Sequence, residues 1–399
     1  MRAKVIDKNI RIAIIGGHMT PALAVLNKLQ EKGFHNIVWI GQKYSQTGDT
    51  NYSSEYSLIN RKAIKFIDLQ TGKLWKKWTR ATWKKALLNL LLIPGGFIQA
   101  AFIILKYKPK IIIGFGGYLN VPIFLQFPLI KLLRVKLYLH EQPVRPGLAT
   151  RTTYRFADQV FLSWAQSRKY FSKHRHIKIT GNPMEAEFLN ARASKKFFAN
   201  NLPILLIIGG NQGANTFNKR LRSSILEKYL ETFNIVHQTG HSSITRDLEL
   251  ARKEAVSLPA KFKRRYQVFD FIEPEKLSRI LDNTTLVLSR SGANTVQKIL
   301  FKGIPTVFMP LPWSSNNEQL ENAKLASKTG IAKIVEFREG LTDQGLYQEI
   351  MTAYEQTLIN TSFNPRKTWK EAKTEARKLV KLNAADKILK YIITDLETM

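Results

Sequence analysis

The sequence predicts an α/β protein with two doubly wound parallel-sheet domains that face each other across a cleft. The run from Ile204 to Ala214, ILLIIGGNQGA, places five apolar residues before three glycines. Such an apolar run is typical of a buried parallel strand. A helix that opens just after it presents free N–H groups to a phosphate. The run from Arg11 to Pro21, RIAIIGGHMTP, repeats this pattern near the start of the chain.

The order of the remaining elements supports two such domains, because strands that alternate with helices favour a parallel sheet. The first helix is expected over Pro21–Lys32, and the pattern restarts after Gly181-Asn182-Pro183. We therefore expect domains at 1–182 and 183–364, with the end of the chain, 365–399, joining the first domain through a basic helical stretch over Pro365–Lys390. Predicted strands are Arg11–Ile15, Asn36–Ile40, Ile64–Asp68, Lys110–Ile113, Lys136–Leu139 and Gln159–Leu162, then Ile204–Ile208, Asn234–Gln238, Tyr266–Phe269, Thr285–Leu288, Thr306–Met309 and Ala332–Val335.

Composition limits the class of partner. The 399 residues are 44% hydrophobic, which suffices for two or three domains with buried cores. The chain has 62 Lys and Arg against 30 Asp and Glu, a formal net charge of +32, which predicts a negatively charged partner. We expect an anionic membrane surface and phosphorylated ligands rather than nucleic acid, because no nucleic-acid recognition motif accompanies the charge. Cysteine is absent, which excludes disulfides, thiolate metal sites and cysteine nucleophiles.

One segment departs from the globular pattern. Ala86–Leu105, ALLNLLLIPGGFIQAAFIIL, is 20 residues without a charge, interrupted by Pro94-Gly95-Gly96. A buried helix–turn–helix and a transmembrane helix are possible interpretations. We favour a surface that docks into a membrane, because tryptophan and lysine beside an apolar run are typical of the interface. The residues that precede the run and form this predicted surface are Trp75, Trp78 and Trp83 with Lys73, Lys76, Lys77, Arg80, Lys84 and Lys85.

Candidate catalytic residues follow the strands of the first domain. His18 follows Gly16-Gly17 at a strand end, where ligands bind in open α/β sheets, and it could act as a base. The alternative is a structural histidine. The glycines of Gly114–Tyr118, GFGGY, form either a tight turn or a second backbone nest for an anion. Glu141 is either a general base or sugar-hydroxyl partner, or part of a helix-capping cluster.

Polar residues also follow the strands of the second domain. Arg290–Thr295, RSGANT, opens a helix after a strand, and Asn316–Gln319 with Asn322 follows another. Amides and carboxylates at a strand end suit a hydroxyl-rich ligand such as a sugar, and helix capping is the alternative. No spacing typical of a metal site is present in the sequence, so we expect no metal and no other cofactor.

Taken in order, these motifs resemble one family. GGH-x-x-P-A, GFGGY-x-x-x-P, HEQ, GNP, GG-x-QGA, RSGA-x-T and EQ-x-x-NA, over residues 10 to 335, are similar to the MurG family of peptidoglycan glycosyltransferases. The resemblance implies a GT-B fold of two Rossmann-like domains. It also implies inverting, metal-independent transfer of N-acetylglucosamine from UDP-GlcNAc to lipid I, the undecaprenyl-pyrophosphoryl muramyl-pentapeptide. Such an enzyme serves cell-wall synthesis, and hence cell shape and division, as a peripheral protein on the cytoplasmic face of the membrane.

The resemblance also implies roles for individual residues. His18 and Glu141 are the candidate bases. The acceptor side is implied at Gly16, Gly17, Gly116, Gly117 and Tyr118. The donor side is implied at Asn211, Gln212, Gly213, Ala214, Ile272, Arg290, Ser291, Ala293, Asn294, Thr295, Lys298, Glu318 and Gln319.

Four departures from the family pattern concern the site. The first loop is GGH in place of GGTGGH, and Pro143 cannot donate the amide contact of the family's HEQN. Glu185 stands where the family often has arginine, and Lys298 stands where the family has a glutamate that bonds the ribose hydroxyls. An ammonium cannot accept a hydrogen bond, so we expect altered donor binding, and Lys298→Glu is expected to preserve or tighten UDP binding. Two alternatives stay open: a related GT-B glycosyltransferase with another acceptor or donor, and a non-catalytic membrane-bound scaffold.

Overall fold

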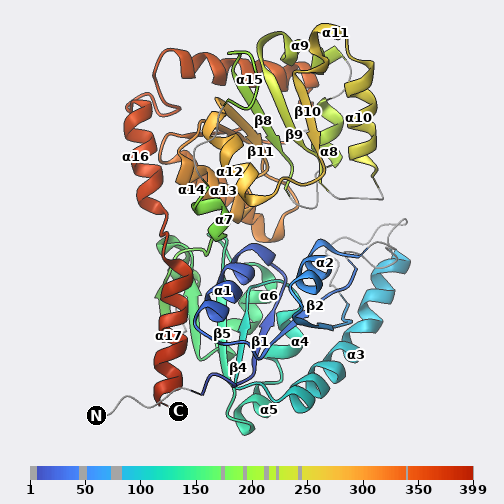
Figure 1. Cartoon of the computed structure of the whole chain (residues 1–399), viewed down its shortest axis with the longest axis vertical. Helices are drawn as coiled ribbons and strands as arrows, with labels where there is room; N and C mark the ends of the chain where they lie inside the picture. The colour runs from blue at the N-terminus through green and yellow to red at the C-terminus, as the bar shows by residue number, and fades with distance from the viewer. Residues whose placement is uncertain are drawn as a thin grey trace. The chain divides into compact units, whose positions relative to one another are not determined.

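The computed structural model describes residues 7–44, 52–72, 83–171, 176–191, 196–210, 215–221, 224–240, 245–337 and 340–398. The chain forms two compact α/β units, each with its own parallel sheet (Figure 1). Unit 1 comprises Met1–Gln142, Pro146–Met184 and Lys381–Met399, and unit 2 comprises Pro143–Arg145 and Glu185–Val380. The predicted fold class, two doubly wound parallel-sheet domains, is confirmed.

Unit 1 contains a seven-stranded sheet in the order β3-β2-β1-β4-β5-β6-β7. Its strands are β1 (Ile12–Ile15), β2 (Ile37–Gly41), β3 (Lys65–Asp68), β4 (Ile111–Gly114), β5 (Lys136–Glu141), β6 (Gln159–Leu162) and β7 (Ile177–Ile179). Its helices are α1 (Met19–Glu31), α2 (Ser54–Arg61), α3 (Trp83–Tyr107), α4 (Asn120–Phe124), α5 (Phe127–Leu132), α6 (Leu148–Thr153) and α17 (Ala384–Thr398), with 3-10 turns at Tyr154–Phe156 and Ala165–Phe171.

Successive residues of the buried strands contribute to opposite faces of this sheet. Ile12 and Ile14 of β1 belong to one apolar cluster with residues of α1 and α17, whereas Ala13 and Ile15 belong to another with residues of α3 and α4. Successive side chains of a strand point to opposite faces, so a strand covered on both faces is apolar throughout. Figure 1 shows α1 and α17 side by side on unit 1, in contact with each other.

Unit 2 contains a six-stranded sheet in the order β10-β9-β8-β11-β12-β13. Its strands are β8 (Ile204–Ile208), β9 (Asn234–Gln238), β10 (Tyr266–Phe269), β11 (Leu286–Ser289), β12 (Thr306–Phe308) and β13 (Ala332–Ile334). Its helices are α7 (Ala186–Leu189), α8 (Asn215–Asn218), α9 (Ser224–Thr232), α10 (Asp247–Ser257), α11 (Ala260–Lys263), α12 (Pro274–Asn283), α13 (Ala293–Lys302), α14 (Glu318–Ser327), α15 (Asp343–Leu358) and α16 (Trp369–Leu379), with 3-10 turns at Lys219–Leu221 and Ser315–Asn317.

The closing helical stretch is divided between the units, which corrects the expectation that all of 365–399 joins the first domain. α16 belongs to unit 2, where it contacts α13 and where the Arg377 guanidinium donates to the carbonyl oxygens of Phe301 and Lys302. The helix ends at Leu379, and α17 begins at Ala384 and belongs to unit 1. The predicted break near 182 lies close to the observed boundary after Met184.

The apolar run of α3 forms one continuous helix, so the expected interruption at Pro94-Gly95-Gly96 is wrong. Gly96 lies inside the helix and does not make a turn. A Cβ atom built there would lie 2.3 Å from Thr71 Oγ1, and one built on Gly72 would lie 1.5 Å from the Asn89 carbonyl oxygen. The two glycines therefore allow α3 to pack closely on the segment after β3.

Candidate active site

The site of unit 1 is built where the strand order of its sheet reverses. The chain adds β2 and β3 on one side of β1 and β4 to β7 on the other, and α1 and α4, which follow β1 and β4, pack on opposite faces of the sheet. Ligands of open α/β sheets bind at such a point. The turn after β1 carries Gly16, Gly17 and His18, and the turn after β4 carries Phe115 and Gly116. The predicted acceptor-side residues are thus brought together in one place.

His18 bridges these two turns, with its Nδ1 atom 2.9 Å from the carbonyl oxygen of Phe115. A carbonyl oxygen only accepts, so Nδ1 carries the proton and donates it. The neutral ring then has its lone pair on Nε2. Burial lowers the pKa of His18 below its usual value, and this effect outweighs the bond to Phe115. The residue is therefore neutral near pH 7, with one nitrogen able to accept a proton.

Glycine is required in both turns because the two backbones lie against each other. Gly17 has φ +113°, and a Cβ atom there would lie 2.7 Å from the carbonyl oxygen of Gly116. Gly116 and Gly117 have φ +74° and +78°, conformations that side chains other than glycine rarely adopt. A Cβ atom on Gly116 would also lie 3.2 Å from His18 Nδ1. These contacts hold the histidine in a defined position.

Three further residues line this edge, Trp39, Gln42 and Glu55, and none of them was predicted from the sequence as a site residue. The Tyr118 hydroxyl donates a short hydrogen bond to Gln42 Oε1 after β2, and burial raises the pKa of Tyr118 to about 12. The carboxyl group of Glu55 from α2 accepts a hydrogen bond from Trp39 Nε1 at 2.7 Å. Neither Gln42 nor Glu55 stands in a recognisable motif, so no sequence signal could have found them.

Glu141 lies at the end of β5 and is 2% exposed. Its Oε2 accepts a short hydrogen bond from Thr150 Oγ1, and its Oε1 accepts from the Gly147 amide at 3.3 Å. Gly147 is the N-cap residue of α6, so the carboxylate contacts the start of that helix. This geometry matches the helix-capping interpretation of Glu141.

His140, the residue before Glu141, is a second histidine whose ring is held by hydrogen bonds. His140 Nε2 lies 3.0 Å from the Gly181 carbonyl oxygen, so Nε2 carries the proton and Nδ1 accepts from Gln142 Nε2 at 2.9 Å. Burial lowers the pKa of His140 to about 4. The ring is therefore neutral at physiological pH. Both of its nitrogens are engaged, so its role is to hold Gln142 and the loop at Gly181.

The sheet of unit 2 reverses its order between β8 and β11. The predicted phosphate loop Asn211, Gln212, Gly213 and Ala214 lies outside the described residues. Gly210 before it has φ +95°. α8 (Asn215–Asn218) follows this loop and continues directly into the 3-10 turn Lys219–Leu221.

The predicted donor residues after β11 and β12 form one hydrogen-bonded group. Arg290 is 4% exposed, and its Nη1 donates to the Met309 carbonyl oxygen at 2.8 Å while Nη2 donates to Thr216 Oγ1 at 3.1 Å. Burial lowers the pKa of Arg290 to about 10, so the guanidinium stays charged at pH 7. The Ser291 hydroxyl donates to the Gln319 carbonyl oxygen at 2.8 Å. The arginine joins two strand ends to α8 and supplies positive charge at this edge.

The remaining predicted donor residues follow strands β10, β11 and β12 of unit 2. Ala293, Asn294 and Thr295 form the first turn of α13. Glu318 and Gln319 open α14, and Gln319 Oε1 accepts from the Leu311 amide at 2.9 Å. Ile272, which follows β10, is buried, and its amide donates to Gln238 Oε1 at 3.0 Å.

The described part of the predicted membrane surface is exposed. Trp83 and Lys84 begin α3, and both are exposed. Trp75 and Trp78 lie outside the described residues, together with Lys73, Lys76, Lys77 and Arg80, as does the side chain of Lys85. By length and composition alone, Leu87–Tyr107 could cross a membrane, and 28% of its most apolar stretch is buried inside the protein.

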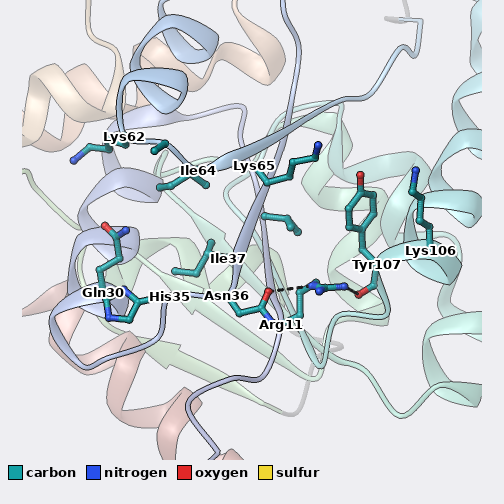
Figure 2. Close-up of a pocket in the computed structure, with 12 residues that line it drawn as sticks. Arg11, Gln30, His35, Asn36, Ile37, Lys62, Ile64, Lys65, Lys106 and Tyr107 are labelled. Carbon is teal, nitrogen blue, oxygen red and sulfur yellow. Dashed lines mark hydrogen bonds between the residues drawn. The ribbon is translucent and has the colours of Figure 1, made fainter.

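The hollow in Figure 2 lies at the opposite, amino-terminal edge of the sheet of unit 1. It measures about 660 Å³ and is lined by residues that begin strands, such as Arg11 and Ile37, and by Tyr107 at the end of α3. Arg11 is held there by Asn36 Oδ1 and the Tyr107 carbonyl oxygen. Ligands of this fold class bind at the carboxyl edge, so the hollow is separate from the site at His18. Among the described residues, no three His, Asp or Glu side chains lie close enough to hold a metal ion.

Comparison with known proteins identifies the family. Residues 14–162 match the glycosyltransferase family 28 N-terminal domain, and residues 204–382 match the family 28 C-terminal domain. The UDP-N-acetylglucosamine--N-acetylmuramyl-(pentapeptide) pyrophosphoryl-undecaprenol N-acetylglucosamine transferase of Treponema denticola is 32% identical over 327 residues, which cover 80% of this chain and 81% of that protein. This chain belongs to the MurG family.

Further relatives agree with this assignment. The transferase of the same name from Shouchella clausii is 29% identical over 364 residues, covering 89% of this chain and 90% of that protein. The crystal structure of MurG from Acinetobacter baumannii has a TM-score of 0.62 at 24% identity, with 98% of this chain and 100% of that chain covered. At that identity the structural likeness concerns the fold.

The largest departure from the MurG family pattern, Lys298, has a partner in the structure. Its Nζ atom lies 3.1 Å from Glu185 Oε1, and both side chains are only 11% exposed. Lys298 belongs to α13, and Glu185 is the N-cap residue of α7. Glu185 and Lys298 are two of the positions that depart from the family, so the two departures form one ion pair. Among the described residues, Glu185 Oε2 has no hydrogen-bond partner.

Proposed function

We propose that this chain transfers N-acetylglucosamine from UDP-GlcNAc to the muramyl 4-hydroxyl of lipid I, giving lipid II for peptidoglycan synthesis. The observation that carries the proposal is His18, held at the switch point of unit 1 in a chain whose relatives are named as this transferase. The neutral ring, with Nδ1–H donated to Phe115, leaves Nε2 free to take a proton.

The chemistry is an inverting displacement. His18 Nε2 takes the proton of the muramyl 4-hydroxyl as its oxygen forms a bond to the anomeric carbon of the donor sugar. The bond from that carbon to the UDP phosphate oxygen breaks, and UDP leaves with the electron pair. The charge that develops on UDP is stabilised by positive groups and N–H dipoles of unit 2, among them the buried guanidinium of Arg290.

The donor is proposed to bind unit 2 and the acceptor unit 1. The glycines after β8 and the first turn of α13 flank the switch point of unit 2, which suits a nucleotide diphosphate. Glu318 and Gln319 supply oxygen and amide groups for sugar hydroxyls. The acceptor pyrophosphate is assigned to the turns around Gly17, Gly116 and Tyr118. We propose no metal and no cofactor in the chemistry.

A turnover assay with UDP-GlcNAc and a lipid I analogue tests the function. His18→Gln is expected to lower kcat by about 10²–10⁴, the range for loss of a general base. His35→Gln is the matched control, because His35 is an exposed histidine of the same unit that lies away from the switch point. No turnover by the wild type would contradict the function, and equal rates for both variants would contradict the role of His18. A different acceptor or donor would support the related glycosyltransferase instead.

We further propose that α3 docks unit 1 on the anionic, cytoplasmic face of the membrane as a peripheral attachment. Large apolar side chains are exposed along one stripe of the helix, Leu91 at 68%, Ile98 at 73% and Phe102 at 59%. The polar residues of the run point into the protein instead. Asn89 is buried, and Gln99 Nε2 donates to the Asp68 carbonyl oxygen at 2.7 Å. A helix with its apolar face outward suits the boundary between headgroups and acyl chains.

Charge contributes to the same attachment. Lys84 and Lys106 are exposed at the two ends of α3, and each basic residue near an anionic surface contributes about 1 kcal/mol. A polyprenyl acceptor stays in the bilayer, so an enzyme that uses it must work at the membrane. This is the physical reason to connect the apolar stripe with the proposed reaction.

Sedimentation with vesicles of rising anionic-lipid content tests the docking. A Leu91→Gln/Ile98→Gln/Phe102→Gln variant is expected to lose binding. The matched control is Leu358→Gln/Ile359→Gln, which removes similarly exposed apolar side chains of unit 2. Equal binding of both variants, or no binding by the wild type, would refute the role of α3. Binding without turnover would favour the scaffold alternative.

A further inference from the structure

A carboxylate from α2 lies inside the carboxyl edge of unit 1, between the ends of β1 and β2. Glu55 Oε1 accepts a hydrogen bond from the indole Nε1–H of Trp39 at 2.7 Å. The backbone N–H groups of Gly17 and Gln42 lower the pKa of the same carboxyl group, against the larger effect of burial. One hydrogen bond, from Trp39, and two glycines at adjacent strand ends, Gly16 and Gly41, thus surround this carboxylate.

The space around this carboxylate exists because two glycines adjoin it. A Cβ atom built on Gly16 would lie 1.6 Å from Glu55 Oε1, and one built on Gly41 would lie 3.1 Å from Glu55 Cδ. Neither glycine has a positive φ, so their conformation does not require glycine. We define the carboxylate cradle as the Trp39 indole N–H and the Cα atoms of Gly16 and Gly41.

We propose that the carboxylate cradle is an anion-binding site filled by Glu55, and that Glu55 is a positioning residue that holds the Gly16–His18 turn. The positioning part rests on the proposed function, because it concerns His18 as the base. The cradle itself is a property of the fold and can be tested without turnover.

The contacts connect Glu55 to the reacting end of unit 1. Its carboxylate lies against Gly16, the first residue of the turn that carries His18. Gly17 also lies against Gly116, so the turn is held between Glu55 on one side and the β4 turn on the other. Gln42, the residue after Gly41, accepts from the Tyr118 hydroxyl. Loss of the carboxylate therefore frees the turn that carries the histidine.

Burial is the largest effect on this carboxyl group and raises its pKa, so Glu55 fills the cradle as a full anion only above about pH 7. Burial raises the pKa of Glu55 to about 7, while the bonds from Trp39, Gly17 and Gln42 act in the opposite direction by stabilising the charged form. A buried carboxylate is costly unless donors surround it. The Trp39 indole N–H is such a donor, and it would be equally available to a small anion of the same shape.

Chemical rescue with formate is the test. Glu55→Ala empties the cradle, and formate has the carboxylate that the variant lacks. We expect the Tm of Glu55→Ala to rise with formate concentration to a plateau, as for a ligand that binds only the folded state. The indole N–H resonance of Trp39, assigned with a Trp39→Phe variant, should shift over the same concentrations. Without formate, kcat should fall about 10- to 100-fold, the range for a misplaced catalytic group, and formate should restore it. KM for UDP-GlcNAc should stay unchanged.

Glu55→Gln is the matched variant, because its amide fills the cradle without supplying an anion. It should show lowered kcat and no response to formate, and it keeps the test valid if Glu55→Ala does not fold. Formate that changes neither the Tm nor the Trp39 resonance of Glu55→Ala would overturn the cradle. Formate that binds without raising kcat, or wild-type kcat in both variants, would overturn the positioning role. A wild type without turnover would refute the proposed function, while the Tm and the resonance would still decide on the cradle.

Discussion

Removing the ammonium of Lys298 is expected to destabilise unit 2 strongly. The Nζ atom lies 3.1 Å from Glu185 Oε1, and both side chains are 11% exposed. Lys298→Met leaves a buried carboxylate whose Oε2 already lacks a partner among the described residues. Breaking a buried pair by removing one partner costs about 3–5 kcal/mol. At about 2–4 °C per kcal/mol for a unit of this size, Tm should fall by roughly 6–20 °C.

Lys298→Glu alone should be worse, because it places two carboxylates against each other. The expected gain in UDP binding for Lys298→Glu is therefore opposed by repulsion from Glu185. The informative variant is the double reversal Glu185→Lys/Lys298→Glu, which keeps the pair and places a carboxylate at the position where the MurG family has one. We expect its stability to recover to within about 1 kcal/mol of the wild type and its affinity for UDP to be at least that of the wild type.

Thermal unfolding and calorimetry with UDP measure the two effects in one double-mutant cycle. The matched control is Arg279→Met, which removes the partner of Glu275 in a pair whose side chains are 44% and 55% exposed. An exposed pair contributes about 0–1 kcal/mol, so this variant should be nearly neutral. A Lys298→Met variant within 1 kcal/mol of the wild type would refute the reasoning. So would a double reversal that is no more stable than Lys298→Glu.

Four further predictions follow from the site of unit 1. Because burial lowers the pKa of His18, kcat/KM should be constant near pH 7 and fall only below pH 6.5 as the ring becomes protonated; a pH–rate profile with its acidic limb above 6.5 would contradict this. Gly17→Ala should lower the free energy of unfolding by about 1–3 kcal/mol, measured by thermal unfolding, because of strain at positive φ, and it should also displace Gly116. Gly33→Ala is the control, because Gly33 has a positive φ but open space around it, so this variant should show the strain alone. The pKa of His140 is lowered to about 4, so the folded state binds this proton only at a lower pH than the unfolded chain does. As the pH falls from 6.5 to 4, the free energy of unfolding of the wild type should therefore decrease by roughly 3 kcal/mol relative to His140→Gln, as measured by urea unfolding. Turnover should be unchanged in EDTA, and a strict requirement for added metal would show the proposed chemistry to be wrong.

Most strands were predictable because each is a short apolar run covered on both faces. β8, β9 and β10 lie at the predicted positions, and β1 differs by one residue. β7 (Ile177–Ile179) was missed, because it is a three-residue edge strand with exposed Lys178 at its centre and carries no apolar run. The Pro-Gly-Gly of α3 was misinterpreted because a glycine that permits close packing has the same sequence signature as one that makes a turn.

The candidate site was predictable only in part. His18 and Arg290 were found because glycine turns and polar residues at strand ends follow a local pattern. Glu55 was not found, because α2 brings it to Gly16 from a distant part of the chain, and nothing near Glu55 in the sequence marks it. The sequence shows that Lys298 departs from the family pattern, but its partner Glu185 lies 113 residues away, and only the structure identifies the ion pair.

The sequence by itself determined the two parallel-sheet domains, the glycine turns at their carboxyl edges and the MurG family. These features are encoded locally, by the spacing of apolar residues and by glycines next to strand ends. The tertiary structure decided which partner each buried charge has, that α3 turns its apolar stripe outward, and that α16 and α17 belong to different units. The physical reason is that the free energy of a buried charge or an exposed apolar face depends on groups brought near it from distant parts of the chain. The sequence order alone does not say which groups those are.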